Sequence, residues 1–366
     1  MKKKNNLLKQ LFFLIPIYLF VYLLGDIFFS NFIYLKSVKY GCMKKFEYYY
    51  ELEKNCKSHE KLIGGVPSYK VYTDENGYRY SGKNKKKTND NIVVFIGDSY
   101  TYGWGLDYHK TFVGIIENLQ DKYYINNLAV PSYSPTVYLH QIKKIKENLI
   151  YPKKIFLVLD QTDAMNEANR WMADKDAKPK LYEKITNKKK DFWKDFRRKN
   201  LKGTRIFAMN LNSFLRNIRY KIENKENFFI EPRRGSFWAD FIHTDWEKLD
   251  EDKNWSPNGI AGGLKKIEEK IFKISMVAKE MNSEFYIVIY PWADTLSNGQ
   301  KVFNWENFAN KICNNSHCNE VINLFPEFLE YKSKNKNWTG DLFLKGDPHW
   351  TEKSHKIVAD KIIKYF

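Results

Sequence analysis

The chain lacks several features that mark specialised classes of protein. It has only four cysteines in 366 residues, and their spacing matches no familiar zinc site. We find no internal repeat and no RNA-binding signature, which argues against a repeat array and against nucleic acid as a partner. Acidic residues are outnumbered, with 43 Asp and Glu against 61 Lys and Arg and a formal net charge of +18. Because Lys recurs along the whole chain, this excess indicates either a lysine-rich composition or an anionic partner.

The N-terminus combines lysines with a long apolar run. Lys2, Lys3 and Lys4 follow the initial Met and precede the run from Leu11 to Gly25, and apolar residues resume after Asp26. A membrane-spanning helix needs about 20 apolar residues, which this stretch supplies if Asp26 lies near the outer interface. A cleaved signal peptide is the alternative, but no small-x-small cleavage motif follows Leu24. We predict a cytoplasmic tip and an uncleaved single-pass anchor in residues 1–35, with the remaining chain facing outward.

The cysteines fall into two pairs that are local in the sequence. In an outward-facing domain two disulfides are expected, and four cysteines allow three connectivities. We predict the local one: Cys42 with Cys56, and Cys313 with Cys318. A metal site that recruits His317 or His355 is the alternative, although its ligand spacing would be unfamiliar.

The remaining chain alternates between sequence patterns typical of β-strands and patterns typical of α-helices. Residues 36–90 are predicted as a juxtamembrane segment and a lead-in hairpin. Within them, residues 36–65 form a helix with a cysteine loop, and two strands flank the Asn76–Gly77 turn. From residue 91 onward, short β-branched or aromatic runs alternate with helical patterns. The predicted strands are Ile92–Ile96, Tyr123–Asn127, Lys154–Leu159, Glu284–Tyr290 and a short one from Val321, and the predicted helices include Thr111–Leu119, Val137–Asn148 and Gly263–Met281. This alternation predicts an α/β fold with a central parallel sheet covered by helices on both faces.

About a hundred residues, 164–262, interrupt the alternation. They are basic and aromatic, and Leu211–Ile222 has the pattern of an amphipathic helix. We interpret them as a helical insertion in a domain of residues 91–366. The insertion could serve as a lid or a substrate-facing subdomain, or it could be a peripheral decoration.

Two short motifs carry candidate chemistry. The strand Ile92–Ile96 leads directly into Gly-Asp-Ser, so that Ser99 lies at a strand-to-helix turn, where it is either a nucleophile or a helix N-cap. Some 250 residues later, Asp347 and His349 lie two positions apart, which places their side chains on the same side of an extended loop. A serine becomes a strong nucleophile when a histidine takes its proton and an acid orients that histidine. The chain offers these three groups in the order Ser, Asp, His.

Together, these motifs resemble the SGNH (GDSL-type) hydrolase superfamily, and in particular its membrane-anchored bacterial members that handle acyl groups on cell-surface glycans. The resemblance covers roughly residues 66–366, in islands. It implies a three-layer, flavodoxin-like sandwich, with Ser99 as the nucleophile, His349 as the general base and Asp347 as the orienting acid. Much of the superfamily has Asp and His three residues apart, whereas the offset of two found here resembles some glycan-modifying members.

The resemblance also implies donors for the oxyanion of the tetrahedral intermediate. The Ser99 amide would be one. The family's second and third conserved sequence blocks resemble residues 127–135 and 159–163 of this chain. In the second block Ser132 stands where glycine is usual. In the third block Thr162 stands where asparagine is usual, with Asn166 as an alternative donor. These two departures from the family pattern weaken the case for ordinary esterase activity.

Aromatic residues near the motifs are candidates for substrate contacts. Tyr102 and Trp104 follow Ser99 closely, and Trp292 follows a predicted strand. They could stack on sugar rings, or they could simply pack against the sheet.

We therefore expect a serine esterase or O-acetyltransferase of the bacterial inner membrane, with its catalytic domain on the periplasmic side. Its substrate would be a polysaccharide or glycolipid, and a membrane protein could donate the acyl group. Nothing in the sequence indicates a metal or organic cofactor. A catalytically degenerate glycan-binding subunit and a lipase or thioesterase are the alternative functions.

Overall fold

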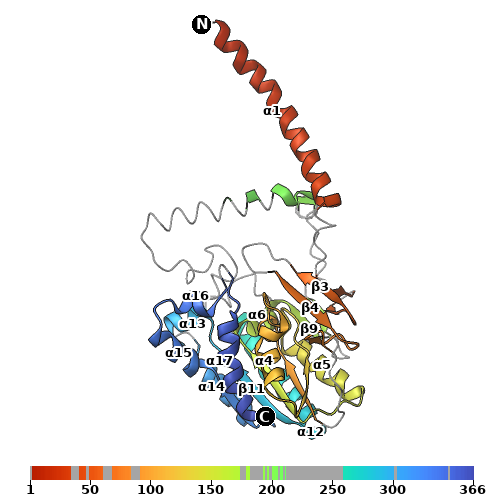
Figure 1. The fold of residues 1–366 in the computed structure, drawn as a ribbon, viewed down its shortest axis with the longest axis vertical. Coiled ribbons are helices and arrows are strands. Elements are labelled where there is room, and N and C mark those ends of the chain that lie inside the picture. The colour runs from red at the N-terminus through yellow and green to blue at the C-terminus, as the bar shows by residue number, and fades with distance from the viewer. Residues whose placement is uncertain are drawn as a thin grey trace. The chain divides into compact units, whose positions relative to one another are not determined.

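The computed structural model describes residues 2–33, 41–46, 49–60, 68–83, 91–173, 179–181, 193, 196–197, 200–204, 207–208, 211, 259–300, 303–344 and 347–366. The chain divides into two compact units (Figure 1). Unit 1 comprises Met1–Tyr40 and Asn187–Phe228, and unit 2 comprises Gly41–Thr186 and Phe229–Phe366.

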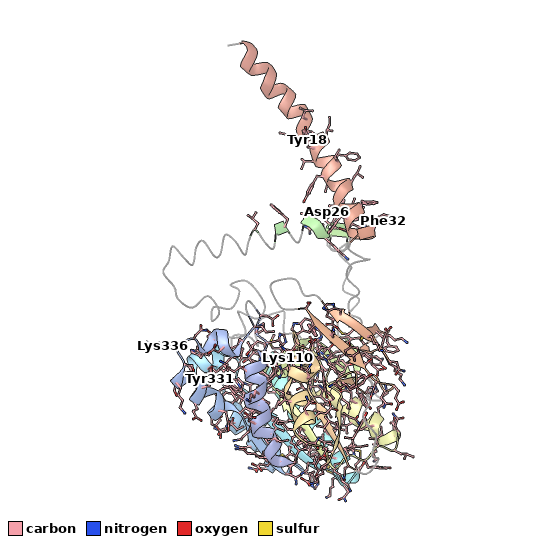
Figure 2. All side chains as sticks on the ribbon, in the orientation of Figure 1. Tyr18, Asp26, Phe32, Lys110, Tyr331 and Lys336 are labelled. Carbon is pink, nitrogen blue, oxygen red and sulfur yellow. A yellow bond between two sulfur atoms is a disulfide. The ribbon has the colours of Figure 1, made fainter. Side chains whose placement is uncertain are left out.

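Unit 1 is built on one long apolar helix. Helix α1, Lys2–Phe28, continues into a π-helical turn, Phe29–Ile33. The stretch Leu14–Phe32 has a mean hydropathy of 1.6 over its 19 residues and is long and apolar enough to cross a membrane, as a membrane anchor or a signal sequence would be. Most side chains from Leu14 to Leu24 are exposed, whereas Asp26, near the Phe32 end of the helix, is buried (Figure 2).

Unit 2 contains an eight-stranded sheet in the order β12-β11-β8-β6-β7-β5-β4-β3. Its strands are β3 Lys57–Glu60, β4 Tyr69–Thr73, β5 Arg79–Tyr80, β6 Ile92–Ile96, β7 Tyr124–Asn127, β8 Lys154–Leu159, β11 Glu284–Ile289 and β12 Glu320–Asn323. The strands from β12 to β7 pair in parallel, and β5, β4 and β3 extend the sheet in antiparallel fashion. Taken in chain order, the parallel strands have the arrangement 2-1-3-4-5, which is flavodoxin-like. The predicted α/β fold with a central, mostly parallel sheet is confirmed.

Helices cover both faces of this sheet. They are α3 Ser99–Tyr102, α4 Phe112–Leu119, α5 Pro135–Glu147, α6 Gln161–Asn169, α12 Gly259–Glu280, α13 Ala293–Asn298, α14 Trp305–Asn314, α15 Phe325–Lys334, α16 Trp338–Leu342 and α17 Glu352–Ile362. The C-terminal helices α13 to α17, in blue, gather on one side of unit 2 in Figure 1.

Strand β6 shows how the layers form. All five of its residues are buried, as expected of a β-branched and aromatic strand at the centre of a parallel sheet. Val94 and Ile96 belong to the core cluster that contains residues of α5, α12 and α14. Val93 and Phe95 belong to the opposite cluster, which contains residues of α4 and α17. The alternation of side chains along a strand therefore produces two cores, one on each face.

Two expectations for the flanking segments need correction. The helix predicted within residues 36–65 is wrong, because strands β1 (Met43–Lys45) and β2 (Tyr50–Leu52) pair with each other there and β3 pairs with β4. The insertion also begins later than residue 164. Helix α6 belongs to the core and packs against α12, and the short hairpin of β9 (Trp171–Ala173) and β10 (Pro179–Leu181) follows it. The expected helix Leu211–Ile222 lies, apart from Leu211, outside the described residues.

Other local predictions agree with the structure. Strands β4 and β5 pair antiparallel on either side of the Asn76–Gly77 turn. Disulfides join Cys42 to Cys56 and Cys313 to Cys318, so all four cysteines are oxidised and none is available as a metal ligand.

Candidate active site

The candidate nucleophile lies where β6 ends, next to the point at which the order of the parallel strands reverses. In open α/β sheets this crevice, beyond the carboxyl ends of the strands, is where ligands bind. Asp98 caps α3 by accepting a hydrogen bond of 2.9 Å from the Tyr100 N–H, so Ser99 begins that helix. Gly97 is required for the tight turn, because a Cβ there would lie 2.2 Å from Thr101 Oγ1. Gly103 ends the helix with a φ of 84°.

A short hairpin-like loop carries Asp347 and His349. Phe343 and Trp350 form an antiparallel bridge, and the Leu344 N–H donates to the His349 carbonyl at 2.8 Å. The Tyr100 hydroxyl, from the helix that begins at Ser99, donates to the Pro348 carbonyl at 2.7 Å. The nucleophile's helix and the histidine loop are therefore tied to each other directly.

These two segments bring Ser99, His349 and Asp347 into one hydrogen-bonded chain. Ser99 Oγ lies 2.7 Å from His349 Nε2, and His349 Nδ1 is hydrogen-bonded to Asp347 Oδ1. The same Asp347 oxygen also accepts the His349 backbone N–H at 3.0 Å. Because the His349 and Asp347 side chains are 16% and 20% exposed, the chain of groups opens to solvent. The arrangement can transfer the serine proton to an oriented imidazole.

Three buried carboxyl groups lie behind the nucleophile. Burial and the charge of Asp160 raise the pKa of Asp98 well above its usual range, and burial together with both of these neighbours raises the pKa of Asp163. Asp160 accepts hydrogen bonds from the Tyr290 hydroxyl at 2.7 Å and from Trp292 Nε1 at 2.8 Å. This cluster holds the carboxyl ends of β6, β8 and β11 together.

The hydroxyl of Thr162 is occupied within this cluster. Thr162 Oγ1 lies 2.6 Å from Asp160 Oδ1 and 3.2 Å from Asp98 Oδ2. A hydroxyl has one hydrogen, so it donates to one carboxyl and accepts from the other when that carboxyl is protonated. The expectation that Thr162 donates to the oxyanion is therefore contradicted, because its single donor is already used.

The structure places the other expected oxyanion residues as follows. Ser99 supplies the first amide of α3. Ser132 has a φ of 62°, the left-handed conformation that glycine adopts readily and that costs other residues about 1–2 kcal/mol. Its carbonyl accepts a hydrogen bond of 2.8 Å from Trp171 Nε1. Position 132 thus keeps a glycine-type backbone despite its side chain. Asn166, on α6 beyond Thr162, is 9% exposed.

Only one of the three candidate aromatic contacts is placed to meet a substrate. Tyr102 and Trp292 are 2% and 4% exposed, so we correct their assignment from substrate contacts to packing residues. Trp104 is partly exposed, and its ring centroid lies 5.8 Å from that of the His349 imidazole. Tyr100 approaches the same imidazole at 4.8 Å but is buried.

Arg79 is a site residue that sequence reasoning missed. It is 1% exposed, and its guanidinium donates to the carbonyls of Tyr102, Gly103 (2.9 Å) and Leu106 (2.5 Å). These carbonyls belong to the turn that carries Trp104, so Arg79 fixes that turn. An arginine in a short strand after a hairpin turn gives no sequence signal of such burial.

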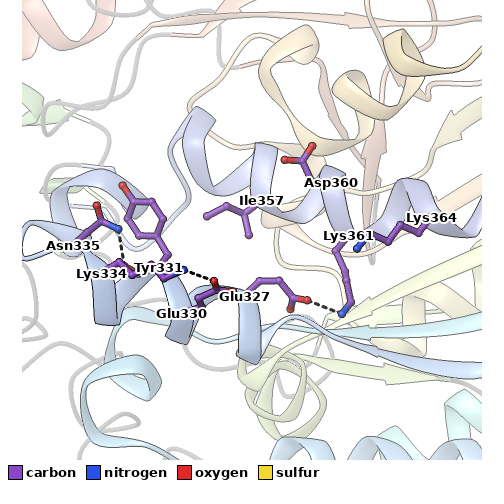
Figure 3. A pocket seen from close by; sticks show the side chains of 9 residues that line it. All are labelled: Glu327, Glu330, Tyr331, Lys334, Asn335, Ile357, Asp360, Lys361 and Lys364. Atoms are coloured by element: carbon purple, nitrogen blue, oxygen red, sulfur yellow. Dashed lines mark hydrogen bonds and ion pairs between the residues drawn. The ribbon is translucent and has the colours of Figure 1, made fainter.

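A cavity of about 340 Å³ between α15 and α17 is separate from these residues (Figure 3). Its lining is mostly charged, and Lys361 Nζ pairs with Glu327 Oε1 at 2.6 Å. Its lining contains no Ser, Cys or His, so it offers no nucleophile or general base. Within the described part of the chain, no group of three or more His, Cys, Asp or Glu is arranged to hold a metal ion.

Comparison with solved structures finds GDSL-type lipolytic hydrolases and esterases at low similarity. A lipolytic protein of the G-D-S-L family from Veillonella parvula is 12% identical, with a TM-score of 0.41 over 75% of this chain and 97% of that one. The esterase EstA from Pseudoalteromonas sp. is 11% identical, with a TM-score of 0.39 over 75% and 98%. The acetylxylan esterase Axe2 from Geobacillus stearothermophilus is 9% identical, with a TM-score of 0.37 over 76% and 95%. No family model and no curated protein matches the chain.

Proposed function

We propose that the protein is a membrane-anchored serine esterase or O-acyltransferase that acts on ester-linked acyl groups, acetyl in particular, of an extracytoplasmic polysaccharide or glycolipid. The observation that carries the proposal is the continuous hydrogen-bonded chain from Ser99 Oγ through His349 to Asp347. A serine that was merely capping a helix would need no imidazole at 2.7 Å and no carboxylate behind that imidazole.

The reaction follows from this geometry. Ser99 Oγ attacks the acyl carbonyl while its proton passes to His349 Nε2, and Asp347 stabilises the resulting imidazolium. The tetrahedral intermediate collapses, His349 returns the proton to the leaving sugar oxygen, and an acyl-enzyme remains. Water then regenerates Ser99 in a hydrolase, whereas a sugar hydroxyl accepts the acyl group in a transferase.

Two features support a sugar ester outside the cytoplasm. Disulfides form and persist in oxidising compartments, and this chain has two. The partly exposed Trp104 ring beside His349 offers an apolar face for a sugar ring next to the reacting ester. The apolar helix α1 would hold the protein at the bacterial inner membrane, with unit 2 on the periplasmic side.

The direct test is turnover of p-nitrophenyl acetate by the full-length protein in detergent. We expect Ser99→Ala to abolish turnover above background and Ser333→Ala, at an exposed serine on α15, to leave it unchanged. Release of acetate from an acetylated glycan, compared with transfer to a sugar acceptor, separates hydrolase from transferase. Equal rates for the wild type and Ser99→Ala would refute the proposal.

A glycan-binding subunit without catalysis is the second candidate. The engagement of the Thr162 hydroxyl by buried carboxyl groups favours it, because one side-chain donor to the oxyanion is then missing. This alternative predicts glycan binding that Ser99→Ala leaves intact, with no acyl-enzyme at any time.

A further inference from the structure

The apolar helix of unit 1 carries one polar face. Tyr22, Asp26 and Ser30 are spaced four residues apart, so they lie above one another on the helix. Asp26 is 6% exposed and Ser30 is 0% exposed, whereas Leu24 and Phe28 on the other faces are 51% and 56% exposed. An ionisable residue within a membrane helix is costly and therefore calls for a partner.

The partner is a short stretch of the insertion, residues 200–204. The N–H groups of Gly203 and Thr204 each donate to the Asp26 carboxylate at 2.7 Å. The Lys202 N–H donates to the Ser30 hydroxyl at 2.8 Å. Asn31, the residue directly after Ser30, donates through Nδ2 to Asn200 Oδ1 at 3.0 Å. The polar face of α1 is thus satisfied by the chain that follows residue 199.

This contact leaves no free space for a side chain at residue 203 unless the Asp26 carboxylate shifts. A Cβ on residue 203 would lie 2.6 Å from Asp26 Oδ1, which is shorter than any ordinary contact. The Tyr22 hydroxyl meets the Thr204 hydroxyl at 3.1 Å, so the contact extends along two turns of the helix. Backbone amides, side chains and a glycine together make it a specific docking site for the insertion on α1.

The docked segment exposes apolar side chains, and the sequence around it is basic. Trp193, Phe207 and Leu211 are 68%, 65% and 42% exposed. Residues 188–205 contain nine Lys or Arg and two Asp. Aromatic residues beside clustered basic residues are typical of segments that lie in the interface of an anionic membrane, where each basic residue contributes about 1 kcal/mol.

We propose that the insertion, through its described residues 193, 196–197, 200–204, 207–208 and 211, binds the surface of an anionic lipid bilayer next to α1 and is held there by Asp26. Asp26 lies about 9 Å along the helix from the Phe32 end of the apolar stretch, at the depth of the interface rather than the bilayer centre. The proposal goes beyond the esterase function and rests only on α1 spanning a membrane. On this proposal the insertion is a second membrane attachment, and not the lid that its basic, aromatic composition suggested.

The test uses full-length protein in nanodiscs with a spin-labelled lipid that quenches tryptophan just below the headgroups. The discs contain either phosphatidylcholine alone or two parts phosphatidylcholine to one part phosphatidylglycerol. The contribution of Trp193 is the difference between the wild type and Trp193→Phe, and the buried Trp338, with Trp338→Phe, is the matched control. We expect the Trp193 signal to fall at least twofold in the anionic discs and less in the neutral discs, while the Trp338 signal does not change.

Asp26→Ala tests the docking site. It should stay in the discs, because α1 becomes more apolar, but its Trp193 signal should lose at least half of the quenching. Incorporation into discs reports whether α1 anchors the protein, and p-nitrophenyl acetate turnover reports whether it is an esterase. A missing anchor or a missing esterase activity can therefore be told apart from failure of this proposal. A Trp193 signal that is unquenched, equally quenched in neutral and anionic discs, or unaffected by Asp26→Ala would overturn it.

Discussion

Replacing Asp347 tests how the imidazole is held. In the structure a single carboxylate oxygen, Oδ1, accepts both the His349 ring N–H and the His349 backbone N–H. Asparagine has an oxygen in the same position and can accept both bonds, so Asp347→Asn should keep the tautomer and lose only the charge. Alanine removes the acceptor and the charge together.

The expected magnitudes differ accordingly. A hydrogen bond to a charged group contributes about 1–2 kcal/mol more than a neutral one, so Asp347→Asn should lower kcat roughly 5- to 30-fold. Asp347→Ala leaves the base unoriented and should lower kcat by about 10²–10⁴-fold. The assay is steady-state turnover of p-nitrophenyl acetate, with Glu352→Gln, an exposed carboxylate paired with Lys110, as the matched control. An Asn variant as inactive as the Ala variant would refute this account of the shared oxygen.

Three further predictions concern the surroundings of the site. Thr162→Val should lower the free energy of unfolding by about 1–3 kcal/mol and should lower kcat by less than tenfold. A kcat loss of about 10²–10³-fold with unchanged stability would instead make Thr162 an oxyanion donor. Burial lowers the pKa of His355 from 6.5 to about 3, so the unfolded chain binds its proton more readily and the wild type loses stability as the pH falls below 6.5. The melting temperature of His355→Gln should therefore rise relative to the wild type between pH 7 and pH 5, and a constant difference would contradict the prediction. Replacing Cys42 and Cys56 by serine should cost about 3 kcal/mol and removing the other disulfide about 2 kcal/mol, because their sequence separations are 14 and 5 residues, and the opposite order of melting temperatures would count against it.

The parts of the fold that the sequence predicted are those with local signals. Strand β6 is β-branched and aromatic throughout, and α12 repeats apolar residues at helical spacing, so each could be assigned from its own residues. The three groups of the Ser99 site could be named because each lies in a short motif. Their convergence followed from the order of strands and helices.

The parts that could not be predicted depend on contacts distant in sequence. The strands between residues 43 and 60 are short and polar, and their pairing with each other and with β4 leaves no periodicity that distinguishes them from a helix. Trp292 follows a strand, as a substrate contact would, but its indole N–H is used by Asp160, 132 residues away. Arg79 likewise serves carbonyls more than 20 residues away. Burial of this kind emerges only when the layers assemble.

The central claim is that Ser99 is an activated nucleophile, and covalent labelling tests it most directly. Full-length protein would be treated with a fluorophosphonate, and the modified peptide would be identified by mass spectrometry in the wild type, Ser99→Ala and Ser333→Ala. The structure predicts one label per chain on Ser99, lost in Ser99→Ala and retained in Ser333→Ala. No label on the folded wild type, or equal labelling of Ser99→Ala, would contradict the account.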